Sequence, residues 1–378
     1  MTNDSQFQPT DSQFLLNPYP WLAKMRQEAP VFYDKEQQAW IVFRYDDVER
    51  VVSEWKTFSS KSPQPLGRED FTQSLPQTDP PKHQSLRTLV QKVFTPHRVE
   101  TMASRITELT QELLDQMKQH KQVDLIQAFS SPLPIIVIGE ILGVSLEERS
   151  DFKRWSDGVL ASDPTAIKNM ADYFRQLLEK RQSHPGQDLI SDLIAAYEEG
   201  EKLTGQEVVD FCILLLTAGN ETTTNLITNT IWCLHEHPDE NQRLRNDLSL
   251  LPSAIEEVLR YYSPITFLNR FTQVETQIGD QTIPQGQLVH PWLTSANRDE
   301  LHFENADRFI IDREPNKHFA FGNGIHFCLG APLTRLEAKI GLKALLSEFP
   351  NLRVDSKQPL KPLPNIRVHG LESLSVLL

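Results

Sequence analysis

The sequence is poor in cysteine, with 3 in 378 residues, and contains no C-x-x-C pair. Cys212, Cys233 and Cys328 are odd in number and far apart, which argues against a disulfide framework and against a zinc knuckle. Few, unpaired cysteines are typical of proteins in a reducing compartment. We therefore expect the protein to reside in the cytoplasm.

Long hydrophobic runs and excess positive charge are also missing. The most apolar run, residues 211–216, ends before polar groups and is too short to span a bilayer. The polar residues 1–13 lack the basic-then-apolar order of a signal peptide. With 38 basic and 51 acidic residues, the net charge of −13 opposes non-specific nucleic-acid binding. We expect neither a membrane nor a nucleic acid as partner.

What the chain does contain is enough apolar sequence, 39% of its residues, for a large core. It has no Gly/Ser linker, fixed-period repeat or long low-complexity tract. Residues 59–81, rich in Ser, Pro and Gln, are predicted to form a long loop. Most of the rest has helical periodicity. We predict one mainly helical domain over residues 1–378, in which 1–16 form a loose N-terminal segment.

The most informative stretch is residues 321–330, FGNGIHFCLG, which precedes a helix-like segment. A thiolate at a helix N-terminus is stabilised by the helix dipole and by free N–H groups. Gly324 and Gly330 would let the backbone approach a flat ligand, against which Phe321 could pack. Haem iron is one metal that takes a single cysteine thiolate. The alternatives for Cys328 are a buried structural thiol and a nucleophile paired with His326, although no cysteine-protease signature accompanies it.

A second unusual stretch lies inside a predicted long helix at residues 206–235. Its ends are apolar, yet its middle contains Gly219, Glu221 and three consecutive threonines that begin with Thr222. Glycine inside a helix costs roughly 1 kcal/mol against alanine, and an unpaired buried carboxylate costs more. Such violations indicate either a functional groove with an acid and an alcohol for proton delivery or a kinked core helix whose hydroxyls bond back to its own carbonyls.

Both stretches resemble segments of the cytochrome P450 family. The pattern F-x-x-G-x-H-x-C-x-G resembles its haem-binding loop, and AGNETT at residues 218–223 resembles its oxygen-activation segment. The resemblance runs from about Asn17 to the C-terminus, and it looks like the soluble bacterial and archaeal type. It implies the mainly α P450 fold, a helical triangular prism with minor β-sheets. It also implies haem b, with iron ligated by the Cys328 thiolate, and places the cofactor-binding positions at Ala218, Gly219, Phe321, Gly324, His326, Cys328 and Gly330.

The resemblance also implies the reaction. Glu221 and Thr222 become the catalytic pair that relays protons during dioxygen activation, and peroxide-driven relatives usually lack this pair. The implied activity is monooxygenation, in which one oxygen atom enters a C–H or C=C bond and the other leaves as water. The alternatives are a peroxide-driven peroxygenase or decarboxylase on the same fold, a non-catalytic haem-binding protein, and, from another class, a helical binding module without haem.

Two basic residues four apart, His83 and Arg87, follow Pro80-Pro81 and share one face of a predicted helix. Taken alone they would form a solvated basic face. The resemblance makes them partners of the haem propionates, together with Arg270 at the start of a strand-like stretch and His326.

The E-x-x-R pattern of Glu257 and Arg260 places both side chains on one helix face, and Glu256 could compete for the arginine. Taken alone it would be a surface ion pair. By resemblance the pair is structural and supports the haem loop. Arg308 is the candidate third partner, although Ala306 stands where the family usually has proline.

No flavin or iron–sulfur module is visible, so the two electrons must come from a separate ferredoxin or flavodoxin with its reductase. Such carriers are acidic, which predicts a basic patch. Residues 59–77, 214–218, 265–268 and 369–371 are mostly apolar and should line the pocket for a small apolar substrate, lipid-like, terpenoid or steroid-like. We expect a monomer. The candidates for the basic patch are Lys82, Lys92, His97, Arg98, Arg335 and Lys339.

Overall fold

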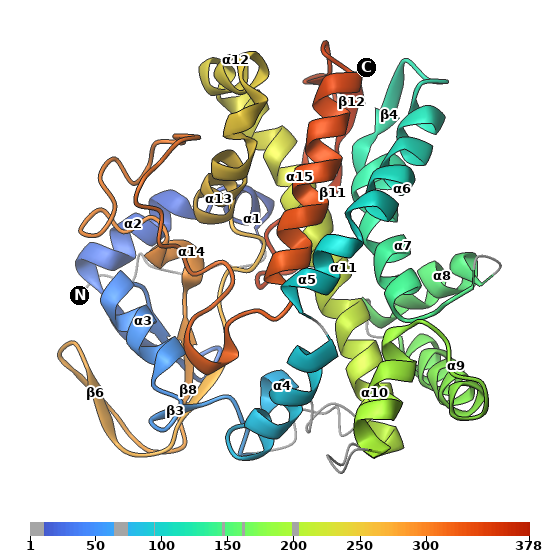
Figure 1. Cartoon of the computed structure of the whole chain (residues 1–378). Coiled ribbons are helices and arrows are strands. Elements are labelled where there is room, and N and C mark those ends of the chain that lie inside the picture. Colours follow the sequence, from blue (N-terminus) through green and yellow to red (C-terminus); the bar gives the residue numbers. More distant parts are fainter. Residues whose placement is uncertain (1–10, 64–74, 94, 146–147, 161–162, 199–203) are drawn as a thin grey trace.

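The structure of this chain is a computed structural model, and helices dominate it. It describes residues 11–378 apart from 64–74, 94, 146–147, 161–162 and 199–203. Figure 1 shows most of the long helices gathered into one body, with the larger sheet and a β-hairpin at its edge. The predicted mainly helical architecture with minor sheets is confirmed.

The longest helix, α11, runs through the middle of the helical body and contacts α7, α8, α9, α10, α12, α13 and α15. Its predicted span of 206–235 is observed as Gly205–Glu236. It begins at a capping box, in which the Thr204 side chain and Glu207 satisfy each other's backbone N–H. The α-helices are α1 (Ser12–Leu16), α2 (Tyr19–Glu28), α3 (Tyr45–Ser53), α4 (Lys82–Val93), α5 (Pro96–Thr101), α6 (Ala103–Met117), α7 (Pro132–Ile141), α8 (Arg149–Leu160), α9 (Pro164–Ser183), α10 (Leu189–Glu198), α11, α12 (Pro238–Asn246), α13 (Leu251–Tyr261), α14 (Leu293–Ala296) and α15 (Ala331–Glu348).

The main sheet has five strands in the order β1-β2-β8-β5-β3. The pair β2–β8 is parallel and the other pairs are antiparallel. Smaller sheets are β4-β12-β9, β10-β11 and the hairpin β6-β7. The strands are β1 (Val31–Asp34), β2 (Ala39–Val42), β3 (Phe58–Ser59), β4 (Gln122–Asp124), β5 (Arg270–Thr272), β6 (Thr276–Ile278), β7 (Gln281–Ile283), β8 (Leu288–Pro291), β9 (Arg353–Val354), β10 (Lys361–Pro362), β11 (Leu371–Ser373) and β12 (Ser375–Leu377).

Two predictions about irregular segments need correction. The N-terminal segment 1–16 is not loose throughout, because Ser12–Leu16 is helical and the Asp11 side chain accepts the Gln13 N–H as an N-cap. Residues 59–81 are not all loop, since a short 3₁₀ helix covers Leu75–Gln77 and Ser59 ends a strand. Residues 1–10 and 64–74 lie outside the described part of the chain.

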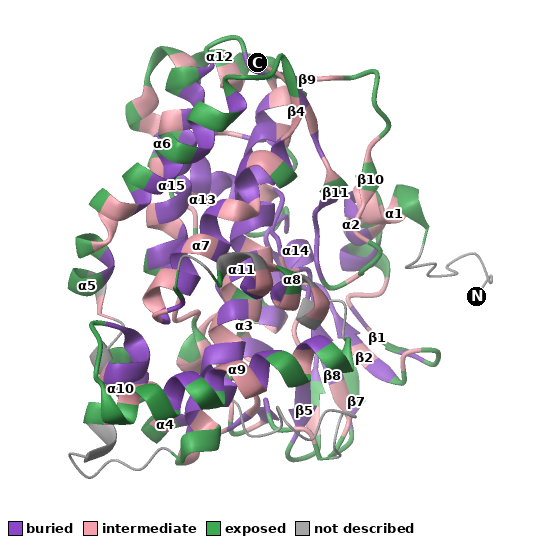
Figure 2. Cartoon of the chain, turned by 90° about the vertical axis from the view of Figure 1, so that its right-hand side faces the viewer, coloured by how far each residue is buried: buried purple, intermediate pink, exposed green. Residues whose placement is uncertain are grey.

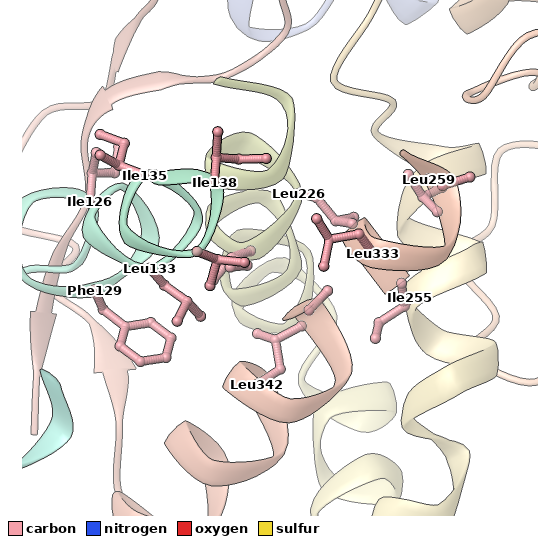
Figure 3. Close-up of a cluster of buried hydrophobic side chains, with 14 of the residues drawn as sticks. Ile126, Phe129, Leu133, Ile135, Ile138, Leu226, Ile255, Leu259, Leu333 and Leu342 are labelled. Carbon is pink, nitrogen blue, oxygen red and sulfur yellow. The ribbon is translucent and has the colours of Figure 1, made fainter. Parts of the chain in front are cut away.

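One large apolar core joins α7, α11, α13 and α15, and Figure 2 shows buried residues along the middle of these helices. Figure 3 shows Ile138, Leu226, Leu259, Leu333 and Leu342 within this cluster. Burial of one such side chain is worth about 1.5–3 kcal/mol. The core therefore fixes α11, which contains the predicted Glu–Thr pair, against α15, which begins directly after the cysteine loop. Within the described ranges, no helix is both long and apolar enough to cross a membrane.

Candidate functional site

One side of the middle of α11 is incompletely covered by neighbouring side chains. This side, formed by Leu214, Ala218 and Thr222, is called the open stripe. Leu214, Ala218 and Thr222 are spaced by four residues and therefore lie on one side of the helix. Ala218 is exposed and the other two are half-buried, whereas Leu216 and Asn220 on other faces are buried. An exposed alanine at the centre of a core helix means that neighbouring side chains leave space beside it.

The predicted acid–alcohol pair lies at this stripe. The Thr222 hydroxyl donates to the Ala218 carbonyl at 2.6 Å, so its remaining capacity is to accept a hydrogen bond. Thr217 bonds back in the same way, to the carbonyl of Ile213 at 3.0 Å. Glu221 is half-buried, and burial raises the pKa of its carboxyl above the ordinary value. The hydroxyls that bond back to the helix and the open stripe thus occur together in α11, so both features considered from the sequence are present.

Gly219 has a packing reason to be glycine. A Cβ added there would lie 3.1 Å from Cδ1 of Ile138 on α7. The glycine therefore allows α7 and α11 to approach closely. The assignment of Gly219 to the cofactor site stays a prediction. The assignment of Ala218 also stays a prediction, and its position in the open stripe is compatible with it.

The cysteine loop presents Cys328 at the N-terminus of α15. The Cys328 N–H donates to the Phe321 carbonyl at 2.8 Å, which closes the loop. Burial raises the pKa of the Cys328 thiol, while hydrogen bonds from the backbone N–H groups of Gly330 and Ala331 lower it. Burial prevails, so the pKa of the thiol lies above its ordinary value, and the two N–H groups are already aimed at the sulfur whose thiolate form ligates metal.

Two glycines of the loop have backbone angles that favour this residue type. Gly322 has φ +69° and Gly324 has φ +67°, in the left-handed region. A Cβ at Gly324 would also lie 3.1 Å from Cα of Ser53, at the end of α3. The loop is therefore seated against α3, and no larger residue fits at Gly324 without a shift.

Three buried nitrogen-bearing side chains meet near the start of this loop. His83 of α4 and His326 have ring centroids 4.3 Å apart, and the Nε2 atom of each is buried without a hydrogen-bond partner. Burial lowers the pKa of His83 to about 4 and that of Arg270 to about 10. In the described part of the chain, no carboxylate lies within ion-pair distance of Arg270, which donates to the Asn269 carbonyl at 2.9 Å.

Among the described residues, the Nε2 atoms of His83 and His326 lack a hydrogen-bond partner and the buried charge of Arg270 lacks a counter-ion, and both conditions are costly. The cluster therefore indicates a missing anionic partner. A cofactor with two carboxylates fits His83, His326 and Arg270. The fourth predicted propionate partner, Arg87, shares the His83 face of α4, and its Nη2 donates to the Phe327 carbonyl at 2.8 Å. Both α4 residues thus lie on one face, as their spacing predicts, and this face contacts the cysteine loop.

Asp79 was missed by the sequence reasoning. Its carboxylate accepts hydrogen bonds from the Ser59 hydroxyl and, at 3.3 Å, from the Ser60 N–H, while its carbonyl accepts the His83 N–H at 3.0 Å. It therefore fastens the start of α4 to β3. Its Oδ1 lies 3.9 Å from Nε2 of His326, too far for a hydrogen bond. The signal in the sequence was an aspartate directly before Pro80-Pro81.

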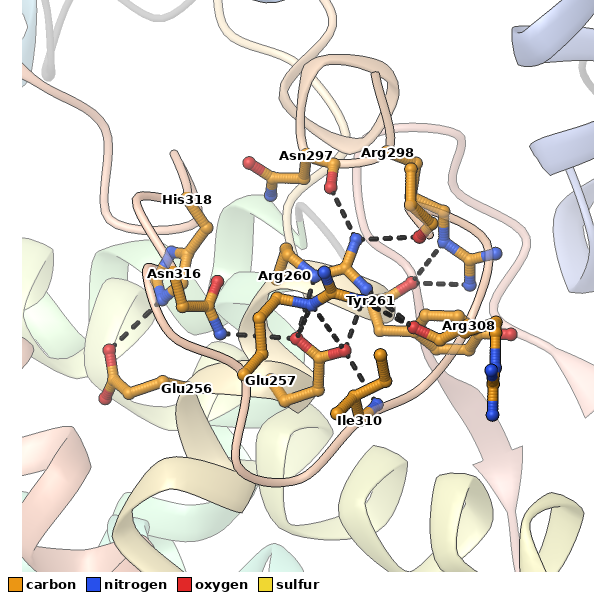
Figure 4. A network of polar contacts seen from close by, with 12 residues as sticks. Glu256, Glu257, Arg260, Tyr261, Asn297, Arg298, Arg308, Ile310, Asn316 and His318 are labelled. Carbon is orange, nitrogen blue, oxygen red and sulfur yellow. Dashed lines mark hydrogen bonds and ion pairs between the residues drawn. The ribbon is translucent and has the colours of Figure 1, made fainter. Parts of the chain in front are cut away.

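Behind the cysteine loop, Glu257 and Arg260 form a fully buried ion pair with two bonds of 2.8 Å (Figure 4). The same guanidinium donates to three loop carbonyls, those of Asn297 at 2.8 Å, Ala306 at 2.9 Å and Arg308 at 3.0 Å. The pair is therefore a structural clamp on this loop and not a surface ion pair.

The predicted third partner of the clamp is wrong. Arg308 is exposed and contributes its carbonyl alone, whereas Nε of Arg313 donates to both oxygens of Glu257 at 3.1 Å. The loop turns between the two arginines, and Ile310 N–H also reaches Glu257 at 2.9 Å. The backbone therefore still passes Glu257 after Arg308, and the side chain of Arg313, five residues later, takes the role.

Glu256 does not compete for Arg260. It accepts from Arg335 at 2.7 and 2.8 Å and contacts His318 at 3.1 Å, and these partners lower its pKa to about 2. Arg335 also lies over the Phe321 ring, 4.5 Å from its centroid. Sequence spacing could not show this because both partners come from distant segments.

The predicted basic patch is partly neutralised. Lys82 pairs with Glu207 at 3.1 Å, Arg98 pairs with Asp192, and Arg335 pairs with Glu256. His97 and Lys339 are exposed, and the side chain of Lys92 lies outside the described residues. The patch that would attract an acidic carrier stays a prediction.

Of the predicted pocket walls, the turn 369–371 is buried and tied to α11. The side chain of Asn229 donates to the His369 carbonyl at 3.1 Å, and the His369 ring stacks on Tyr262 with centroids 3.9 Å apart. The other walls are Ile265–Leu268, partly buried, and the α11 stripe. Most of the loop segment 59–77 lies outside the described residues.

A helical body with one cysteine presented to a helix N-terminus, beside buried donors that suit two carboxylates, defines a haem-thiolate protein. The chain matches the family described as Cytochrome P450 over residues 150–371. It is 42% identical to the putative cytochrome P450 YjiB of Bacillus subtilis, over 97% of this chain and 95% of that protein. It is 38% identical to the cyclomarin C epoxidase CymV of Salinispora arenicola, over 88% and 89%. The crystal structure of CYP109E1 from Bacillus megaterium in complex with testosterone superposes with a TM-score of 0.92 at 42% identity, covering 97% of this chain and 99% of that one.

The chain belongs to the cytochrome P450 family. The predicted P450 fold is confirmed by these structures. Its cofactor is haem, and its activity is that of a haem-thiolate monooxygenase, which uses a substrate, dioxygen and electrons from a redox partner.

Proposed function

We propose that Cys328 is the thiolate ligand of haem b, and that the chain oxidises an apolar molecule of about steroid size by hydroxylation or epoxidation. The observation that carries the assignment lies next to the cysteine loop, where His83 and His326 have buried Nε2 atoms without a partner beside the buried, uncompensated charge of Arg270. The propionate partners would be His83, Arg87, Arg270 and His326. When bound, the haem supplies dioxygen activation, to which the thiolate contributes electron density.

The remaining chemistry of the proposal belongs to residues of α11. Glu221, with its raised pKa, holds a proton closer to neutral pH than an exposed glutamate does. Thr222 keeps its hydroxyl oriented by the bond to the Ala218 carbonyl, so its oxygen can accept a hydrogen bond from the side of the open stripe. Proton movement through these two side chains favours the monooxygenase over the peroxide-driven alternative.

Replacing Thr222 with alanine is expected to uncouple electron use from product formation. Loss of the hydroxyl removes the group that orders proton delivery, so consumption of NAD(P)H should continue while product per reducing equivalent falls by about tenfold and peroxide rises. The measurement is product and peroxide against NAD(P)H consumed. Thr228→Ala, a back-bonded threonine six residues further along α11, is the matched control. Unchanged coupling in Thr222→Ala would rule out the relay.

The substrate class rests on the relatives and on the apolar walls. CYP109E1 has been crystallised with testosterone and with corticosterone, and this chain is 42% identical to it in both cases. The walls proposed for the site, on α11 and at Ile265–Leu268, contain partly buried apolar residues. A rigid polycyclic molecule would bury much surface in such a pocket without a large loss of conformational entropy.

Titration of the purified holoenzyme with testosterone tests this class. We expect a saturable shift of the Soret band, and turnover with a surrogate ferredoxin system should add one oxygen atom, seen by mass spectrometry with labelled dioxygen. A fatty acid of similar carbon number is the comparison ligand. A spectral response to the fatty acid but not to testosterone would replace the steroid-like class with a lipid-like one.

Three further expectations stay part of this proposal. The electron donor would be a separate ferredoxin or flavodoxin with its reductase, because the chain has only 3 cysteines and no clustered set for its own iron–sulfur centre. The protein would act in the cytoplasm as a monomer. The chain would fold as a single domain, supported by one core cluster that includes residues from Tyr19 to Val376.

A further inference from the structure

A pocket lies beside α12 and β9, two elements that Figure 2 shows at one end of the molecule. Its volume is about 150 Å³. The apolar part of its wall comes from Ile231 and Leu234 near the end of α11, and from Leu352 and Val354 around β9. All four side chains are buried.

The charged side chains of the wall are two arginines. Arg245 of α12 contributes a half-buried guanidinium, the side chain of Arg353 is exposed, and His235 and Asn241 are further polar lining residues. None of the described residues that line the pocket is an aspartate or a glutamate. This is unusual for a protein with a net charge of −13, in which most surface arginines would find an acidic neighbour.

Arg245 is fixed in place but has no counter-ion. Its Nε donates to Oδ1 of Asn241 at 3.0 Å, and its Nη2 donates to the Leu352 carbonyl at 3.2 Å. No carboxylate of the described residues pairs with it, and burial lowers its pKa. A partly desolvated guanidinium that is already oriented and lacks an anion is prepared to bind one.

We propose that this pocket binds a small carboxylate with an apolar body, such as an aromatic or short-chain carboxylic acid. The carboxylate would bind Arg245, and the apolar body would rest on the buried leucines and valine. At about 150 Å³ the pocket is smaller than those of about 300–1,000 Å³ that hold drug-sized ligands, so it takes a fragment of one ring. This site is independent of the proposed haem ligation and substrate.

The test uses the holoenzyme with 4-fluorobenzoate, observed by fluorine NMR. Imidazole in excess occupies the haem, and the Soret band reports that occupancy. We expect saturable binding with a Kd on the order of 1 mM, unchanged by imidazole. 4-Fluorobenzamide, which has the same shape without the charge, should bind at least about tenfold more weakly.

Two variants locate the site. Arg245→Gln should weaken 4-fluorobenzoate binding at least about tenfold. Asn241→Asp is nearly isosteric and places a carboxylate beside Nε of Arg245, so it should cause a similar loss even if the first variant folds poorly. Arg154→Gln on α8, an arginine whose side chain is 69% exposed, is the control and should bind normally.

Three results would overturn the proposal. One is the absence of saturable binding to the holoenzyme. Another is loss of binding when imidazole occupies the haem, because the ligand would then sit in the substrate pocket. The last is wild-type affinity in a folded Arg245→Gln or Asn241→Asp variant.

Discussion

Replacing Cys328 with alanine is expected to abolish the strongly red-shifted Soret band of the reduced, carbon-monoxide-bound protein. The sulfur is presented to the helix N-terminus by hydrogen bonds from Gly330 and Ala331, and alanine has no atom to replace it. Removal of an outer-shell partner of a metal ligand costs roughly 10–100-fold in affinity or activity. Removal of the ligand itself should cost more, so monooxygenase activity should fall below detection.

Cys212→Ala is the matched control for this experiment. Cys212 is fully buried in α11, and burial raises the pKa of its thiol well above the ordinary value, so it should behave as an inert core residue. We expect this variant to keep the red-shifted band. A Cys328→Ala protein that still showed the band would refute the assignment of the ligand. A histidine-type Soret position in the unaltered protein would refute the thiolate chemistry.

The second large effect is expected on stability. Replacing Glu257 with alanine leaves the fully buried guanidinium of Arg260 without its carboxylate, and Arg313 and the Ile310 N–H lose the same acceptor. Breaking a buried pair from one side costs about 3–5 kcal/mol, because an uncompensated charge stays in the interior. Urea denaturation followed by circular dichroism should show a loss of this size, together with poorer haem retention.

The neighbouring glutamate supplies the comparison. Glu256 is 29% exposed and pairs with Arg335, which is 39% exposed, so water can solvate the arginine that is left behind. The buried ring of His318 also loses its partner, so Glu256→Ala should cost about 1–3 kcal/mol, still less than Glu257→Ala. Equal destabilisation by the two substitutions would mean that the Glu257 network is not the structural clamp inferred from its geometry.

Local sequence signals predicted the elements that carry the candidate site. The long helix was predicted to within one residue at each end from its apolar ends, and the capping box at Thr204 is a further local signal for its start. The four-residue spacing of His83 and Arg87 correctly placed both on one face of α4, and the structure shows that this face contacts the cysteine loop. The glycine-rich loop could be predicted because its backbone needs positive φ at Gly322 and Gly324.

Contacts between distant segments could not be predicted from spacing. Arg308 and Arg313 are equally basic and both lie in an irregular loop, so only the course of the backbone decides which of them reaches Glu257. The ion pairs that neutralise Lys82, Arg98 and Arg335 join elements far apart in the chain. Short-range patterns contain no information on such pairings, which tertiary packing creates.

The clamp formed by Arg260 has a consequence for how this part of the chain can vary. Its three contacts to the loop are made to carbonyl oxygens, which every amino acid possesses. The arginine therefore recognises the path of the backbone and is indifferent to the side chains at Asn297, Ala306 and Arg308 through these bonds. That accounts for the tolerance of alanine at position 306, where the family usually has proline. Side chains at these positions can therefore be substituted without loss of the three hydrogen bonds that hold the backbone behind Cys328.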